Sequence, residues 1–332
     1  MAERLYDVVG IGSAIVDIIA RCDDDFITRQ GLSKGIMRLI DAAEADRLYG
    51  EMGPAIEASG GTVPNTCAGL ASFGGKAAFI GKVARDQMGE VFTHDIRAVG
   101  VTFNTAPAEN SATTARSLIL VTPDGERTMN TFLGAAVVLT RKELDPALIG
   151  AGKVLYLEGY SYDQPQAKQA FYEAAEIARA AGTTVALSLS DPFCVDRHRA
   201  DFLDFIRRGV DLVFANESEA QSLYETTDFD AACRSFSADC KLAAVTRGAE
   251  GSVILSGGGE AVSVAAAPVT RVVDTTGAGD LYASGFLFGY ARGLDLAICG
   301  KLGSLAAAEV IGHIGPRPEA SLAALARAQN LI

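Results

Sequence analysis

Apolar and polar positions follow a regular rhythm in the second half of this chain. Short apolar runs of strand length recur after Leu139, near residues 153–158, 184–189, 211–215 and 242–246. Segments of helix length lie between them, near residues 141–149, 165–181, 197–208 and 228–238. Strands that alternate with helices form right-handed β–α–β units. The pattern therefore predicts an α/β fold with a mostly parallel central sheet covered by helices on both faces.

The first twenty residues predict two consecutive strands. An apolar run over residues 5–12 ends in Gly10-x-Gly12, and a run rich in β-branched residues follows over residues 14–20. A dinucleotide-binding turn would need a third glycine and a helix at this point. Both are missing, so we reject that interpretation.

Residues 113–133 predict a β-hairpin, because β-rich runs flank the turn Pro123-Asp124-Gly125. The hairpin interrupts the β–α order, so we expect it to pair with the early strand near Asp17 in a small separate sheet. Asp41 and Glu44 have the spacing of a capping box, which predicts a helix over residues 41–58. Further strands are predicted within 35–40 and 76–83, and helices over 64–73, 86–99, 295–311 and 319–329.

Composition narrows the class of protein. The 332 residues are 49% hydrophobic and 21% charged, enough for a sizeable core. The net charge of −12 argues against a general nucleic-acid binder. Six scattered cysteines without a Cys-x-x-Cys pair fit free thiols in a reducing compartment. The N-terminus does not resemble a signal peptide and no apolar run reaches membrane-spanning length, so we expect a soluble, cytoplasmic protein without a membrane partner.

The segment 274–280, with the sequence DTTGAGD, predicts a turn that opens a helix. Helix N-termini attract anions through their free N–H groups and their dipole. Gly277 and Gly279 let the backbone approach such an anion closely. Asp280 adds a carboxylate beside it, which is either an ordinary charge at a helix start or a catalytic group.

Two more polar clusters follow predicted strands. Asn216 and Glu219 come after the strand near 211–215, and Thr246 and Gly248 come after the strand near 242–246. Each cluster alone fits a simple helix cap. Ligands of parallel sheets bind at the carboxyl ends of the strands, so clusters that share this edge with Asp280 favour a common ligand.

A second group of polar positions lies in the first 65 residues. Asp17 is a lone carboxylate in an apolar strand, where it is either ion-paired or a hydrogen-bond acceptor for a vicinal diol. Gly60 and Gly61 precede the Pro64-Asn65 start of a helix. They either form an ordinary turn or allow close approach to a ligand, with Asn65 supplying an amide.

Taken together, these motifs resemble those of the ribokinase-like (PfkB) carbohydrate kinases. Segment 274–280 resembles the C-terminal signature of that family, and the stretches at 60–66, 74–75 and 81–89 resemble its N-terminal signature. Asn216-x-x-Glu219 resembles its magnesium-associated motif, and residues 246–248 resemble its nucleotide-binding turn. Within the family, the stretches at 14–18, 115–118 and 126–135 are most similar to bacterial adenosine kinases.

The resemblance implies a ribokinase-like fold whose small β-sheet closes over the acceptor as a lid. The lid would comprise residues 14–40 and 111–134, and the large α/β domain residues 1–13, 41–110 and 135–332. It also implies transfer of the γ-phosphoryl group of ATP to an alcohol, most similar to 5′-phosphorylation of adenosine. No Gly-x-x-x-x-Gly-Lys-Ser/Thr segment is present, which excludes a P-loop kinase.

By position, the resemblance assigns roles to residues of this chain. Asp280 would be the base, and the N–H groups of Gly277, Ala278 and Gly279 would form the anion hole. Residues implied to hold ATP are Asn216, Thr246, Gly248, Gly277 and Gly279. Residues implied to hold the acceptor are Ser13, Asp17, Gly60, Gly61 and Asn65. Glu219 would hold Mg²⁺ through water, Arg116 would be a lid arginine that approaches the active site, and a monovalent cation such as K⁺ near Asp274 is a habit of the family.

Alternatives remain at this point. Adenosine and ribose present the same diol and 5′-hydroxyl, so a sugar kinase acting on ribose or a fructose derivative has the same machinery. A phosphosugar acceptor would want extra cations, for which Lys34, Arg116 and Arg127 are the candidates. A non-catalytic relative would not need the base. The chain would be a monomer or a homodimer whose lid sheets pair.

Overall fold

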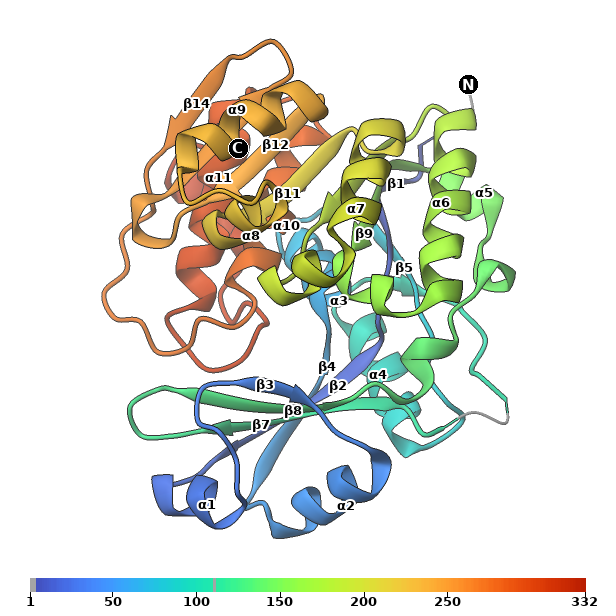
Figure 1. Cartoon of the computed structure of the whole chain (residues 1–332), viewed down its shortest axis with the longest axis vertical. Coiled ribbons are helices and arrows are strands. Elements are labelled where there is room, and N and C mark those ends of the chain that lie inside the picture. The colour runs from blue at the N-terminus through green and yellow to red at the C-terminus, as the bar shows by residue number, and fades with distance from the viewer. Residues whose placement is uncertain (1–3, 110–111) are drawn as a thin grey trace.

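The computed structural model describes residues 4–109 and 112–332, and it arranges them around two β-sheets (Figure 1). The larger sheet has the strand order β14-β13-β12-β11-β10-β9-β1-β5-β6. The strands from β12 to β6 are parallel. The strands are β1 (Tyr6–Ile11), β5 (Ala77–Ile80), β6 (Thr102–Phe103), β9 (Gly152–Glu158), β10 (Thr184–Ser188), β11 (Leu212–Asn216), β12 (Leu242–Thr246), β13 (Ser252–Ser256) and β14 (Ala261–Val264).

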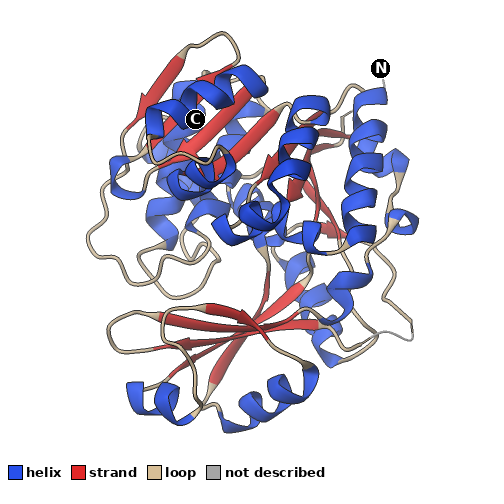
Figure 2. Ribbon diagram, in the orientation of Figure 1, coloured by secondary structure: helices blue, strands red, loops and turns tan. Residues whose placement is uncertain are grey.

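Helices cover both faces of this sheet, as the alternation predicted (Figure 2). One face carries α3 (Thr62–Ser72), α4 (Gln87–Ala98), α10 (Ala278–Tyr290), α11 (Leu296–Val310) and α12 (Leu322–Ala328). The other carries α5 (Pro146–Gly150), α6 (Pro165–Ala180), α7 (Pro192–Gly209), α8 (Glu217–Leu223) and α9 (Phe229–Asp239). Neighbouring strand residues enter different cores, Val8 the first and Val9 the second, because side chains alternate between the faces of a strand. Short 3-10 turns lie at Gly134–Val138, Arg141–Glu143, Gly159–Asp163 and Gly248–Glu250.

The smaller sheet, called the lid sheet below, lies beneath the larger one in Figure 1. Its strand order is β3-β8-β7-β2-β4. The strands are β2 (Ile15–Arg21), β3 (Met37–Leu39), β4 (Ala55–Gly60), β7 (Ala115–Val121) and β8 (Arg127–Phe132), with helices α1 (Asp24–Arg29) and α2 (Ala42–Glu51) beside them. The expected pairing of the hairpin with the strand of Asp17 is confirmed by the parallel contact of β2 with β7.

The prediction of a helix over residues 41–58 was wrong beyond Glu51, where α2 ends. Asp41 does cap the helix, accepting from the Glu44 N–H at 2.8 Å, but the Glu44 carboxylate binds Arg38 at 2.6 Å instead of completing a capping box. Gly53-Pro54 then stops the helix, because proline disfavours a helical residue before it and cannot donate an N–H. Residues 55–60 form β4, which pairs antiparallel with β2. The lid sheet therefore has a strand from a segment that the sequence pattern assigned elsewhere.

Three smaller differences concern other segments. The predicted helix 141–149 is divided into a 3-10 turn and α5, because Asp145-Pro146 starts a new helix. The β13–β14 hairpin over residues 252–264 was not predicted. The predicted domain boundary at 110–111 lies outside the described residues.

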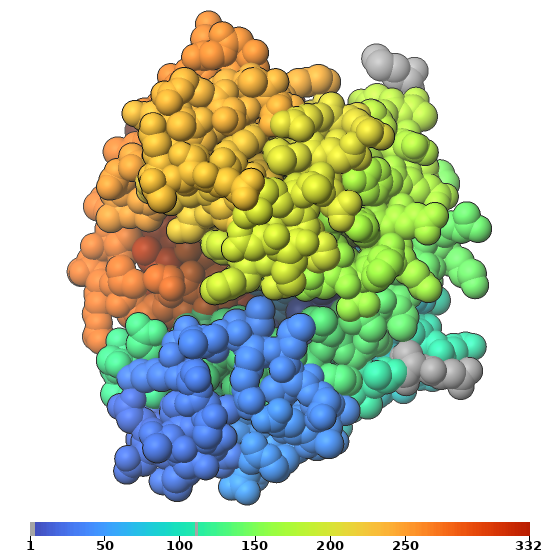
Figure 3. All heavy atoms as spheres, viewed as in Figure 1, coloured from blue at the N-terminus to red at the C-terminus, as the bar shows by residue number. Residues whose placement is uncertain are grey.

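The two faces of the lid sheet have different partners. Ile18 and Leu118 point toward α1 and α2 and join the core that contains Ile27 and Leu48. The opposite face carries Ile19, Ile119, Val121 and Met129, which pack with Ile314 of the large body. This second face is called the cleft face below. Figure 3 shows the lid atoms closed against the body along much of the seam, with a recess beside the orange segment.

None of the helices in the described part of the chain is long and apolar enough to cross a membrane.

Candidate active site

The turn before α10 has the geometry of an anion-binding helix start. Gly277 has a φ of 73°, and a Cβ there would lie 2.7 Å from Pro316 Cβ, so only glycine fits. A Cβ on Gly279 would meet open space. The Ala278 N–H donates to Thr275 O at 3.3 Å, a long hydrogen bond that a stronger acceptor could replace. The turn thus offers N–H groups to a ligand approaching over Gly279.

Asp280 meets Asn65 where α10 crosses α3. The Asn65 amide Nδ2 donates to Asp280 Oδ2 at 2.8 Å, and the Thr66 hydroxyl donates to the Asp280 carbonyl at 3.1 Å. Burial raises the pKa of Asp280 from 3.8 to about 7, against the opposing effect of the Asn65 hydrogen bond; Glu158 and Asp17 raise it further. A carboxyl group with a pKa near neutrality is suited to accept a proton in catalysis.

Two buried polar atoms beside Asp280 have no hydrogen-bond partner among the described residues. They are Asn65 Oδ1 and Glu158 Oε2. Glu158 ends β9, is fully buried, and accepts the Ser13 N–H at 2.7 Å through Oε1. Burial raises the pKa of the Glu158 carboxyl, against the opposing effect of its hydrogen bonds with Ser13, the Val63 N–H and Ser161. Buried polar atoms left unpaired are costly, so the two atoms indicate where a hydroxylated ligand would bind. Sequence reasoning missed Glu158, although it is a lone acid ending an apolar strand.

Asp17 lies on the cleft face of the lid sheet, as the pairing of Asp17 with Ser117 and of Ser117 with Thr131 places all three on one face. Burial raises the pKa of Asp17 to about 6, against the effect of Arg127 and Arg317. A Cβ on Gly60 would lie 2.1 Å from Asp17 Oδ2. Gly61 has a φ of 103°, and its Cβ would lie 2.5 Å from Ser13 O. The glycine pair therefore allows Asp17 and Ser13 to lie against the start of α3.

Arg317 is a further residue that sequence reasoning missed. It follows α11 in a proline-flanked loop, and it donates to Ser59 O at 2.9 Å and to Pro64 O at 2.7 Å. Its positive charge opposes the raised pKa of both Asp17 and Asp280. Arg317 thus holds the end of β4 and the start of α3 beside the two carboxylates.

The predicted nucleotide residues meet at neighbouring strand ends, since Asn216 pairs with Thr246 in the sheet. Asn216 and Glu219 form a capping box at the start of α8, with Asn216 Nδ2 donating to Glu219 Oε1 at 2.6 Å. Gly248 has a φ of 55° in the turn after β12. Asp280, at the start of α10, is close enough to Glu219 for its charge to raise the pKa of Glu219, so the cluster of Asp280 lies near that of Asn216 and Glu219.

Glu219 fits an indirect role in holding Mg²⁺. Burial raises its pKa to about 7, and Asp191 and Asp280 raise it as well. No group of three or more His, Cys, Asp or Glu side chains arranged to hold a metal ion is found within residues 4–109 and 112–332. Mg²⁺ keeps most of its waters and binds one or two carboxylates together with substrate phosphates. A buried glutamate with Asp191 and Asp280 nearby, beside the predicted nucleotide residues, is compatible with that preference.

Arg116 is not brought to these residues. It pairs with Val16 and Phe132 across the lid sheet and forms an ion pair with Asp46 of α2, on the face away from the cleft. The cation on the cleft face is Arg127, whose Nη1 lies 2.9 Å from Asp274 Oδ1. The prediction of a lid arginine approaching the site therefore fits the position of Arg127 and not that of Arg116 in this structure.

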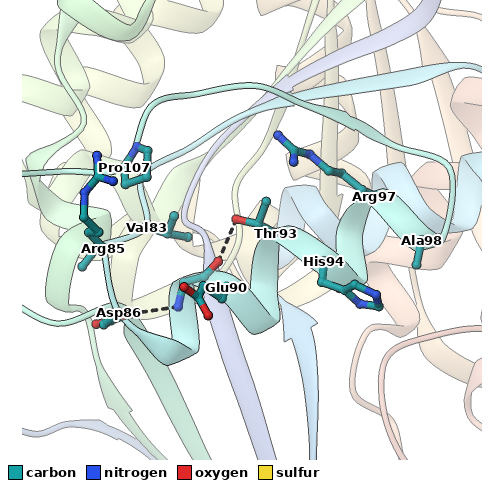
Figure 4. Close-up of a pocket in the computed structure, with 11 residues that line it drawn as sticks. Val83, Arg85, Asp86, Glu90, Thr93, His94, Arg97, Ala98 and Pro107 are labelled. Carbon is teal, nitrogen blue, oxygen red and sulfur yellow. Dashed lines mark hydrogen bonds between the residues drawn. The ribbon is translucent and has the colours of Figure 1, made fainter.

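A separate hollow of about 650 Å³ lies against α4 (Figure 4). It is lined by Arg85, Asp86, Thr93, His94 and Arg97, among others. None of the predicted site residues lines it, so its size does not make it the active site.

Comparisons with known proteins agree on one family. The sequence profile of the pfkB family of carbohydrate kinases matches residues 37–322. An adenosine kinase structure from Sinorhizobium meliloti is 58% identical, with a TM-score of 0.92, over 98% of this chain and 99% of that chain. A probable sugar kinase from Rhizobium etli is 53% identical, with a TM-score of 0.94 over the whole of both chains. Adenosine kinase from Saccharomyces cerevisiae is 27% identical over 93% of this chain and 96% of that protein.

Proposed function

The chain belongs to the pfkB family of carbohydrate kinases, and from that premise we propose that it phosphorylates adenosine on its 5′-hydroxyl, converting ATP and adenosine to ADP and AMP. The observation that carries this proposal is the Asn65–Asp280 contact beside the anion-binding start of α10. The 58% identity to an adenosine kinase over nearly the full length supports adenosine as the acceptor.

In the proposed reaction, Asp280 accepts the proton of the 5′-hydroxyl. The hydroxyl oxygen then forms its bond to the γ-phosphorus as the bond to the ADP oxygen breaks. The Asn65 amide fixes the orientation of the Asp280 carboxylate. N–H groups at residues 277–279 stabilise the negative charge on the transferring group, which is the main demand of phosphoryl transfer.

Kinases of this family use ATP with Mg²⁺, and we propose that Glu219 holds the ion through water. The ion would supply neutralisation of the phosphate charge. Asn216, Thr246 and Gly248 would contact the nucleotide at the ends of β11 and β12. The Asn216 side chain keeps the Glu219 carboxylate pointing in one direction.

The acceptor would lie between the lid sheet and α3. Asp17 and Asn65 would hold the ribose hydroxyls, with Gly60, Gly61 and Ser13 shaping the wall. Glu158 Oε2 and Asn65 Oδ1 are the free acceptors that a hydroxyl would satisfy. We add Glu158 to the acceptor site on this ground.

An apolar edge of the cleft face favours a nucleoside over a bare sugar. Met37 and Leu39 of β3 are 38% and 55% exposed. They pair with Met129 and Thr131, and so lie on the same face as Asp17. Leu39 is in the cross-strand row of Asp17, three strands or about 14 Å away. A base extending along that row from a ribose at Asp17 would cover these side chains.

The decisive experiment measures ADP formation with purified protein, ATP and Mg²⁺ over a panel of adenosine, other nucleosides, ribose and fructose. We expect the highest kcat/KM for adenosine. A higher value for ribose or a fructose derivative would reject adenosine as the acceptor while keeping the kinase assignment, and the 53% identity to a probable sugar kinase makes this the relevant competitor. Absence of turnover with every acceptor would favour a non-catalytic binding protein.

A cytoplasmic location is part of the proposal, because all six cysteines are free thiols and ATP is a cytoplasmic substrate. The monomer and the homodimer both remain compatible with it, and sedimentation distinguishes them.

A further inference from the structure

The environment of Asp274 does not fit the monovalent cation that the family resemblance implies. Asp274 immediately precedes the anion-binding turn, and its side chain is fully buried. Its Oδ1 accepts the Thr276 N–H at 2.9 Å, and its Oδ2 accepts the Gly315 N–H at 2.8 Å. The Arg127 guanidinium lies 2.9 Å from Oδ1. A potassium ion at this carboxylate would bring a second positive charge beside a buried guanidinium, and like charges repel strongly where water is excluded.

Arg127 interacts with Asp274 through its charge and not through aligned hydrogen bonds. Its side chain is only 7% exposed. Its Nε, Nη1 and Nη2 atoms have no aligned hydrogen bond among the described residues, although Nη1 is within ion-pair distance of the carboxylate. The contact is therefore electrostatic rather than a directed two-pronged fork. Burial lowers the pKa of Arg127, whereas Asp274 and Asp17 raise it, so two carboxylates stabilise this charge.

The pair also joins two parts of the fold. Arg127 is the first residue of β8 in the lid sheet, and Asp274 belongs to the large body. Nearby, the apolar contact of Met129 and Ile119 with Ile314 joins the same two parts. Gly125, in the turn before β8, lies against Val273, where a Cβ would be 3.1 Å from the carbonyl oxygen. The lid is thus attached to the segment that leads into residues 277–279.

We propose that Arg127 is a built-in cation for Asp274: it takes the place of a monovalent ion and couples the seated lid to the anion-binding turn. It is a positioning residue that acts through Asp274. The protein consequently needs no K⁺, either for stability or for turnover. The activity part of this inference rests on the proposed kinase function, whereas the stability part does not.

The test replaces Arg127 with Met, which keeps the length and apolar stem of the side chain and removes its charge. The control is Arg21→Met, an exposed arginine on β2 of the same sheet, whose row continues through Val121 to Arg127. Thermal unfolding of the ligand-free proteins is followed in KCl and in tetramethylammonium chloride at equal ionic strength, since the organic cation is too large for a carboxylate site.

We expect the wild type and Arg21→Met to have the same Tm in both salts. Arg127→Met should lose several degrees in tetramethylammonium chloride, because a buried carboxylate loses its counter-charge, and should recover part of the loss in KCl. A wild-type Tm that rises with K⁺ would overturn the proposal, and so would an Arg127→Met variant that responds equally to both salts. Arg127→Lys keeps the charge and, if Arg127→Met fails to fold, serves as the second variant: it should fold and remain insensitive to K⁺, and a K⁺ response would count against the proposal.

The kinetic arm measures kcat and KM in the same two salts. Wild-type kcat should change less than twofold when K⁺ is replaced by tetramethylammonium. In Arg127→Met, kcat should fall by a larger factor than the factor by which the KM for ATP changes, and kcat should depend on K⁺. Loss of wild-type turnover without K⁺ would contradict the inference. A wild-type protein that is inactive in both salts would contradict the proposed function, and the unfolding measurements would then test the role of Arg127.

Discussion

The Asn65 amide donates to the Asp280 carboxylate at 2.8 Å across the contact between α3 and α10, although the two residues are 215 positions apart. Asn65 lies in the first turn of its helix, and Asp280 in the first turn of its own. The contact orients one carboxylate oxygen and leaves Asn65 Oδ1 without a partner in the described residues. The proposed base, the anion-binding turn and the hydroxyl of the proposed acceptor can therefore meet at one point.

Replacing Asp280 with Asn should remove the proposed base while keeping the size and shape of the side chain. We expect kcat to fall by at least about 10²-fold, the lower end of general-base contributions. Adenosine binding, measured by calorimetry, should survive, because the amide can still accept from Asn65. Asp295→Asn, at an exposed helix start, is the matched control and should retain full turnover. Unchanged kcat in Asp280→Asn would remove Asp280 from the mechanism.

Turnover should depend on pH through Asp280. Because burial raises its pKa to about 7, the free enzyme holds much of its base protonated at neutral pH. The kcat/KM for adenosine should rise with pH through about 7 and then level off. Glu219 titrates in the same range, so Glu219→Gln is needed to separate the two groups. A flat profile between pH 6 and 8, roughly one unit on each side of that pKa, would argue against Asp280 as the base.

The same raised pKa makes a stability prediction of defined sign. A carboxyl group whose pKa is higher in the folded protein than its ordinary 3.8 binds its proton more tightly when folded. Its contribution is fully present below about pH 4 and is lost as the pH rises through about 7. At pH 8, Asp280→Asn should therefore have a free energy of unfolding higher than that of the wild type by on the order of 1–4 kcal/mol, measured by denaturant titration. Near pH 4 this difference should disappear. Equal denaturation curves of the two proteins at pH 8 would show that burial does not raise the pKa of Asp280.

Glu158 should contribute to acceptor binding through its free Oε2 atom. Glu158→Gln keeps the size of the side chain and an acceptor for the Ser13 N–H. We expect the KM for adenosine to rise roughly 10- to 100-fold, the range for losing a hydrogen bond to a charged group, with the KM for ATP nearly unchanged. A selective rise in the KM for ATP would place Glu158 on the nucleotide side instead.

Met37 and Leu39 should distinguish a nucleoside from a sugar. The double change to Ser removes the apolar edge of the cleft face, and the KM for adenosine should rise by about tenfold or more, given the apolar area that a base would bury there. Any activity on ribose should be unaffected. Val99→Ser, an exposed apolar position at the end of α4, is the control. An equal effect on ribose would indicate a general disturbance of the lid.

Arg317 should stabilise the acceptor side of the site. Arg317→Met removes the guanidinium donors to the Ser59 and Pro64 carbonyl groups. The Pro64 carbonyl lies within α3 and keeps its helical partner, so the Ser59 carbonyl bears most of the loss. We expect the free energy of unfolding to fall by about 1–3 kcal/mol, the cost of leaving a buried acceptor such as the Ser59 carbonyl unsatisfied. The KM for adenosine should rise more than the KM for ATP, because Gly60 and Asn65 flank these carbonyls. A loss confined to kcat would contradict this positioning role.

Local patterns were enough to predict much of this protein from its sequence. The alternation after Leu139 predicted the parallel sheet, since strand and helix periods depend on nearest neighbours in the chain. The DTTGAGD turn predicted a glycine-lined helix start, because Gly277 needs a conformation that other residues avoid. The hairpin at 115–132 was also visible in its turn residues.

Tertiary structure decided what local patterns do not contain. Residues 55–60 have little apolar alternation, and they are a strand because β2 offers them an edge to pair with. Arg116 and Arg127 are both arginines of one hairpin, and only the pairing register places the first on the α2 face and the second at Asp274. Glu158 and Arg317 became site residues because burial and distant partners determine their roles. Residue types and spacing thus determined the chemistry available to this chain, whereas the packing of sheets and helices determined which side chains meet, because those contacts join positions far apart in sequence.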